Sequence, residues 1–195
     1  MKKKLSIVLM QVALFVAFVV VAIPSSYAEE NETVESEDEA LKAFTSPFGA
    51  KVRLLQLYKN LETQIIKGEE VINVINEVKP DYDLSELELV LENMKSLAEQ
   101  INETVLSIPE EVDTETLQNL ASDFVVLLNE SRSLIRQFSE LLHEDFSGEE
   151  LAQIRTRVNE NAKMKIQERV EGVREMIRQD VRAHNENIVK RMLNK

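Results

Sequence analysis

Residues 84–108 read LSELELVLENMKSLAEQINETVLSI, and their apolar side chains recur at alternating steps of three and four residues. The repeating positions are Leu84, Leu87, Leu91, Met94, Ala98, Ile101, Val105 and Ile108. This spacing places one apolar stripe along one face of an α-helix, whereas a half-buried strand would alternate in steps of two. The segment is therefore predicted to be an amphipathic helix that buries this face.

The segments on either side carry the same repeat. The earlier one has Leu54, Tyr58, Leu61, Ile65, Gly68, Ile72 and Ile75, and the later one has Leu117, Leu120, Phe124, Leu127, Ser131, Leu134, Phe138 and Leu141. A strict seven-residue repeat favours left-handed, coiled-coil-like packing at shallow crossing angles. We therefore expect these helices to lie side by side in a bundle.

Capping residues and prolines mark the ends of four helices. The signals are Ser46 with Pro47, then Pro80, Asp83 with Glu86, Pro109, Asp113, and finally Ser147 with Glu150. They predict helices over 47–78, 84–107, 114–143 and 148–193. Connections this short make successive helices run in opposite directions. The expected fold class is all-α: an antiparallel up-down-up-down four-helix bundle over residues 46–195.

The last helix differs from the other three in length and in repeat. Its apolar positions between Leu151 and Met192 recur about every 3.7 residues, which is closer to the repeat of a straight or slightly right-handed packing. At 1.5 Å per residue it would span about 70 Å, against roughly 35–50 Å for its partners. We therefore expect its end, from about Arg178, to extend past the bundle.

The N-terminal region predicts export. Three lysines precede an apolar run over residues 5–23, and small residues stand at Ser26 and Ala28. This pattern is typical of a signal peptide over residues 1–28, although the run is also long enough to favour an uncleaved membrane anchor. Residues 29–45 begin with EENETVESEDEA and are predicted to be an acidic, disordered spacer. In both cases the bundle is expected outside the cytoplasm, whether secreted, periplasmic or at the cell surface.

Charge and cysteine content limit the possible functions. Residues 1–28 hold 3 of the 23 basic residues and none of the 35 acidic ones, so the remainder carries a net charge of −15. An acidic body does not favour nucleic-acid binding. The chain has no cysteine, so the bundle must be stabilised by its apolar core without disulfides.

Patterns for catalysis are absent from the sequence. His143 and His184 are the two histidines, and neither stands beside a nucleophile motif. The four glycines form no phosphate-binding loop, and no zinc or EF-hand spacing occurs. The sequence therefore predicts no catalytic, cofactor or metal residues, and we expect a protein that is not an enzyme.

Two weaker site hypotheses remain open. Asp81 and Asp83 in one connection, and residues 143–145 in another, would meet at one end of the bundle and offer cation ligands. The alternative is that these side chains only cap helices. Gly68 and Ser131 interrupt two large apolar stripes, which would leave either a small ligand pocket or a close approach of helices.

Three Asn-x-Ser/Thr sequons occur, at Asn31, Asn102 and Asn129. Asn102 and Asn129 fall off the apolar stripes, so these positions are expected to be exposed. Modification depends on the glycosylation enzyme of the host. The three asparagines are therefore candidate glycosylation sites.

The basic end of the last helix is the strongest candidate for function. The predicted partner-binding residues are Arg178, Arg182, Ile188, Lys190, Arg191 and Met192. An apolar strip that outruns its own bundle requires a cover: a second copy, a partner protein, or less favourably an anionic membrane surface. The alternative is a solvated tail. The leading hypothesis is an exported, non-enzymatic interaction or structural protein. The second hypothesis is an extracytoplasmic carrier or chaperone-like protein that binds a small ligand within the bundle.

Overall fold

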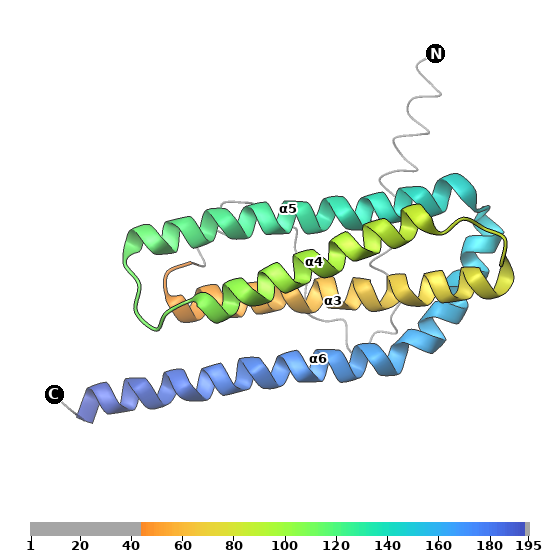
Figure 1. The fold of residues 1–195 in the computed structure, drawn as a ribbon. Coiled ribbons are helices and arrows are strands. Elements are labelled where there is room, and N and C mark those ends of the chain that lie inside the picture. Colours follow the sequence, from red (N-terminus) through yellow and green to blue (C-terminus); the bar gives the residue numbers. More distant parts are fainter. Residues whose placement is uncertain (1–43, 194–195) are drawn as a thin grey trace, which may run out of the picture. The chain divides into compact units, whose positions relative to one another are not determined.

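The computed structural model describes residues 44–193, except for the side chains at positions 187, 188 and 191. This part of the chain is all-helical and forms a four-helix arrangement, as the apolar stripes predicted. The helices are α3 (Pro47–Val78), α4 (Ser85–Ser107), α5 (Thr114–Asp145) and α6 (Gly148–Leu193). Figure 1 shows α3, α4 and α5 grouped together, with α6 lying alongside α3. Residues 1–28, and residues 29–43 of the spacer predicted over 29–45, lie outside the described residues, whereas Phe44 of that spacer is buried in the core.

Three of the four helix starts follow the sequence signals. Ser46 Oγ accepts a hydrogen bond from the Gly49 N–H at 3.0 Å, and Asp113 caps α5 in the same way through the Thr116 N–H. Ser147 and Glu150 bond each other reciprocally, which completes the predicted capping box. These caps satisfy backbone donors that have no partner within the helix.

The start of α4 differs from the prediction. Leu84 occupies the N-cap position with helical backbone angles, and its side chain makes no capping bond. Asp83, expected to pair with Glu86, accepts instead from the N–H and the hydroxyl of Ser85 two residues on. This local turn is a common alternative for aspartate, since its short side chain reaches the nearest backbone donors.

α3 is the central helix of the fold. It packs against α4, α5 and α6, whereas α6 makes few contacts with α5 and none with α4 among the described residues. Leu54, Leu61 and Ile75 of α3 are fully buried, and Phe44 ahead of the helix packs on Phe124 of α5. All four helices therefore contribute to one apolar core, which α6 joins mainly through its contacts with α3.

α3 and α6 run in opposite directions. Glu77, Glu70 and Glu62 of α3 pair with Arg157, Lys165 and Arg169 of α6, so positions that rise along one helix fall along the other. This order continues to the start of α3, where Phe48 stacks on His184 with ring centroids 4.6 Å apart.

The free end of α6 begins later than its length predicted. His184 is still level with the first turn of α3, so only residues 185–193 extend past that turn. At 1.5 Å per residue this overhang is about 13 Å long, and it starts roughly two turns after Arg178. The difference arises because α6 begins beside the C-terminal end of α3 and follows the whole length of that helix.

Candidate functional site

The overhang of α6, defined as residues 185–193, exposes large apolar side chains. Met192 is 72% exposed, Leu193 80% and Val189 53%, while Val181 just before the overhang is 37% exposed. Apolar positions earlier in α6, such as Val158 and Val173, are buried against the bundle. The stripe thus changes from a packed face to an uncovered one beside the first turn of α3.

The cations predicted to bind a partner fall into two groups. Arg178 bonds Glu171 at 2.7 Å and Glu175 at 3.3 Å within α6, and Glu171 is the main reason that its pKa is raised. Arg182 and Lys190 are exposed. The side chains of Ile188 and Arg191 lie outside the described residues. Arg182, Lys190 and Met192 are therefore the predicted residues that the structure places on an accessible surface near the overhang.

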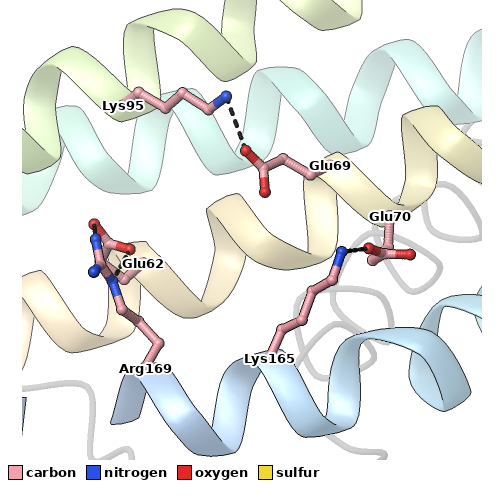
Figure 2. A network of polar contacts seen from close by, with 6 residues as sticks. All are labelled: Glu62, Glu69, Glu70, Lys95, Lys165 and Arg169. Atoms are coloured by element: carbon pink, nitrogen blue, oxygen red, sulfur yellow. Dashed lines mark hydrogen bonds and ion pairs between the residues drawn. The ribbon is translucent and has the colours of Figure 1, made fainter. Parts of the chain in front are cut away.

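A row of ion pairs joins α3 to α6, and sequence reasoning did not find it (Figure 2). Arg169 makes a two-pronged contact with Glu62, with Nε and Nη2 at 2.7 and 3.0 Å from its two carboxylate oxygens. Glu70 is only 4% exposed and bonds Lys165 from α6, and this bond is the main cause of the raised pKa of Lys165. Such a buried carboxylate requires its partner, because an unpaired charge in the interior is costly.

A related pair connects α3 to α4. Lys95 of α4 bonds Glu69 at 2.9 Å, and this hydrogen bond is the main reason that its pKa is raised. Figure 2 shows Glu69 and Glu70 directed to opposite sides of α3, toward α4 and α6 respectively. Glu69 and Glu70, which lie on one turn of α3, therefore hold α4 and α6 in register with α3.

Grooves border this ion-pair row, where α6 packs on α3 and, within residues 44–193, not on α4. One has a volume of about 390 Å³ and a floor of Ile65 and Ile66, with walls from α4 and α6. A second, of about 510 Å³, lies along α3 and α6. Tyr58 and Arg169 line both grooves. Burial, followed by the charge of Glu62, raises the pKa of the Tyr58 hydroxyl. The walls are mixed in charge, and this suits a polar ligand rather than a fully apolar one.

The predicted gap at Gly68 and Ser131 is not present at Gly68. A methyl group added there would meet Leu91 at 3.0 Å and Phe138 at 3.4 Å. Ser131 is buried at 3% exposure, and no buried side-chain polar atom among the described residues lacks a partner. Gly68 therefore serves the close approach of α4 and α5 to α3.

The corner between α5 and α6 is closed by side chains from the α3–α4 connection. Tyr82 donates a hydrogen bond to Asp145 Oδ2 at 2.6 Å, and its ring packs on Phe146 with centroids 5.0 Å apart. Lys79 pairs with Glu150 at 2.7 Å and lies 4.7 Å above the Phe146 ring. We call these five residues the corner latch.

The predicted cation ligands at this end have other roles. Asp145 accepts from Tyr82, Asp83 accepts from Ser85, and His143 Nδ1 lies 2.6 Å from the Ser139 carbonyl. Within residues 44–193 no group of three or more carboxylates and histidines is placed to hold a metal ion.

Two of the three sequons fall within the described residues. Asn129 is exposed on α5, whereas Asn102 is half-buried and lines the groove between α4 and α6. Asn31 lies outside the described part of the chain. A glycan at Asn102 would stand beside this groove, and one at Asn129 would project from α5.

Acid is expected to weaken the corner latch. The hydrogen bond from Lys79, followed by those from Ser147, lowers the pKa of Glu150 from 4.5 to about 2. Because the folded pKa is below the unfolded one, the stabilisation is present above pH 4.5 and is lost as the pH falls toward 2. Urea titrations at several pH values should show this loss in the free energy of unfolding.

Glu150→Gln is the matched test of that assignment. The variant should be less stable than the native chain at neutral pH, and the difference should shrink as the pH falls through this range. Asp83 and Asp113 also have lowered pKa values and remain in both proteins, so their contribution cancels in the comparison. A difference that stays constant down to pH 2 would contradict the role given to Glu150.

Loss of Arg169 should loosen α6. Arg169→Met leaves the Glu62 carboxylate and the Tyr58 hydroxyl without their shared donor. We expect the free energy of unfolding to fall by about 1 kcal/mol, since the solvent exposure of Arg169 limits the effect. Urea denaturation followed by circular dichroism measures the change. The exposed Lys163→Met on the same helix should change stability by less than half as much; equal effects would show that Arg169 adds nothing by its pairing.

Comparisons of the chain with protein-family models, with curated proteins and with solved structures give no match. Among the described helices none is both long and apolar enough to cross a membrane.

Proposed function

We propose that this protein is an exported, non-enzymatic interaction or structural protein that binds a partner through the end of α6. The observation that carries the proposal is the overhang, where Val189, Met192 and Leu193 are exposed beside the cations Arg182 and Lys190. Soluble proteins rarely leave large apolar side chains together at a helix end without a covering surface. A cationic rim would favour a partner with acidic groups around an apolar strip.

Export and topology belong to the same proposal. The lysines and apolar run over residues 1–28 support a signal peptide or, through residues 5–23, a membrane anchor. The short connections support an antiparallel up-down-up-down, coiled-coil-like bundle. Membrane contact would then arise from an uncleaved N-terminal segment or, less favourably, from the basic end of α6.

A pull-down from the native host tests the partner surface. The baits are the full chain and a chain that ends at Asn185, which keeps the Phe48–His184 stack and removes the overhang. Leu89→Asp is the matched control, because Leu89 is 63% exposed on α4. The full chain and the control should recover a defined protein, or a second copy, that the shortened chain loses. Equal recovery by all three baits would reject the overhang as the binding surface.

The groove between α4 and α6 supports a second candidate, a carrier or chaperone-like protein for small ligands. Tyr58, Asn102 and Arg169 offer hydrogen-bonding groups above an apolar floor. Small molecules extracted from the host should then raise the melting temperature of the native chain. A variant with Ile66→Trp, which fills the groove, should lose that rise. A rise that survives in the variant would place the ligand elsewhere.

A further inference from the structure

The α5–α6 corner differs from the other two connections. Pro80 follows α3 and Pro109 follows α4, but no proline occurs from residue 110 to the end of the sequence. Proline removes a backbone donor and clashes with the preceding turn, so it forbids a continuous helix at the first two connections. Only two residues, Phe146 and Ser147, separate α5 from α6, and both can adopt helical angles. The third break is therefore maintained by contacts rather than by the backbone.

Those contacts are the corner latch. Its polar bonds are those of Tyr82 with Asp145 and of Lys79 with Glu150, and the capping box of Ser147 with Glu150 lies beside them. These polar contacts lie at exposed or half-buried side chains, so solvent competes with them, whereas the Phe146 ring is buried in the core and packs on Tyr82. Opening the corner exchanges the polar contacts for water and for continuing backbone hydrogen bonds.

Beyond the corner, α6 is attached to one helix. It packs on α3 and has few contacts with α5 and none with α4 in residues 44–193. Its attachment consists of the ion-pair row and of an apolar face that includes Ile154, Val158 and Val173. When α6 leaves α3, it exposes the carboxylates and the apolar residues of α3 that it covered. The α3 of a second copy whose α6 has also left exposes the same residues.

The directions of the helices permit this replacement. α3 and α5 run the same way, because Phe44 meets Phe124 near their starts and Tyr82 meets Asp145 near their ends. With the corner open, α6 continues the direction of its own α5. In a two-fold symmetric pair, α3 of the second copy runs opposite to that direction, as the ion-pair row requires. In both copies at once, α6 can therefore lie antiparallel to α3 of the other copy.

We propose that two copies of this chain exchange α6 by opening the α5–α6 corner, so that each α6 lies on α3 of the other copy. The proposal rests on the proposed function in taking α6 as the interaction element, and it names the partner as a second copy. Exchange needs no new surface, since every contact between α3 and α6 already exists within one chain. The latch sets how readily exchange occurs.

Cross-linking tests the exchange directly, because the chain has no cysteine of its own. Glu77 of α3 and Arg157 of α6 are paired at 3.4 Å and exposed, so each can be replaced by cysteine. The single variants E77C and R157C are mixed as folded proteins, incubated, and treated with a short bis-maleimide linker. A covalent product of twice the 22.3 kDa chain mass is expected above the background of either variant alone.

Two matched variants make the result decisive. E77C mixed with M164C should give background only, since the Met164 side chain is 80% exposed and so is not packed on α3. Adding Tyr82→Phe and Glu150→Gln to both partners should speed the E77C–R157C product at least tenfold by releasing the latch. A single chain that carries both E77C and R157C is the positive control, because its two cysteines should be linked within the chain. If this control is linked while the latch-released mixture gives no more covalent product than the E77C–M164C mixture, the proposal is overturned.

The outcome separates this inference from the proposed function. A chain that ends at Asn185 keeps the ion-pair row and should still exchange, although it lacks the overhang. If the two copies do not exchange α6 but the pull-down recovers a partner that truncation removes, the overhang remains the binding surface. Only the second copy is then rejected as the partner. If the copies exchange α6 and all three baits recover the same proteins, the α6-exchanged pair is supported. The overhang is then rejected as the binding surface.

Discussion

Replacing Leu61 by alanine should lower the free energy of unfolding by about 3 kcal/mol. Leu61 has no exposed surface and lies on α3, which packs against every other described helix. Removal of three carbons there loses apolar burial and leaves a cavity in the core. Urea denaturation followed by circular dichroism at neutral pH measures the change.

Leu89→Ala is the matched control for that loss. The same three carbons are removed, but Leu89 on α4 is 63% exposed. We expect its stability to stay within about 0.5 kcal/mol of the native chain. If the two variants were destabilised equally, α3 would not be the centre of the core.

Gly68→Leu should also be strongly destabilising, by about 2 kcal/mol. The first added carbon already meets Leu91 at 3.0 Å and Phe138 at 3.4 Å, and three further carbons have no space between them. Better helix propensity than glycine offsets about 1 kcal/mol of the strain. Gly68→Ala should be close to neutral, since a small shift of the Leu91 side-chain end accommodates one methyl group.

Gly172→Leu serves as the counterpart in α6. No atom lies within 4 Å of a methyl group built at Gly172, so only helix propensity acts there. Its stability should rise, by up to about 1 kcal/mol. In the same denaturation experiment, Gly68→Leu should therefore lower the free energy of unfolding and Gly172→Leu should raise it. A Gly68→Leu protein that is as stable as the native chain would mean that α4 and α5 can move away from α3 freely.

The helices and their cores could be predicted because the signals are local. Stripe residues such as Leu91, Ile101, Phe124 and Phe138 are buried as the three-and-four spacing predicted. Ser46, Asp113 and Ser147 begin helices where their side chains reach the next free N–H. Asp83 is the exception, because aspartate can bond either two or three residues ahead and no local feature chooses between them.

The relation between distant helices could not be predicted in the same way. Glu62 and Arg169 are separated by 107 positions, and nothing in either segment specifies their register. The late start of the overhang has the same origin, since it depends on where α6 begins beside α3. The spacing of Glu62, Glu70 and Glu77 on α3 against Arg157, Lys165 and Arg169 on α6 was the one available signal, because opposite charges recur along both helices.

Some residues of the candidate site could likewise be predicted from the sequence, and others could not. Exposure of Met192 and Lys190 follows from length and composition, so their place on a surface was predictable. The role of Arg178 was not, because its pairing with Glu171 spans seven positions on one helix face and competes with binding to any partner. The corner latch involves residues from two connections and appears only when the helices are assembled.

The central position of α3 also sets an order of assembly. α3, α4 and α5 meet through neighbouring segments of chain, so their contacts close short loops. The α3–α6 hydrogen bonds of Glu77, Glu70 and Tyr58 join residues 80, 95 and 111 positions apart, and such long loops carry a larger entropic cost. We therefore expect a folding chain to secure its first three helices early and α6 last. During that interval the future α6 site on α3 stays open, and the concentration of newly made chains would decide which α6 arrives there first.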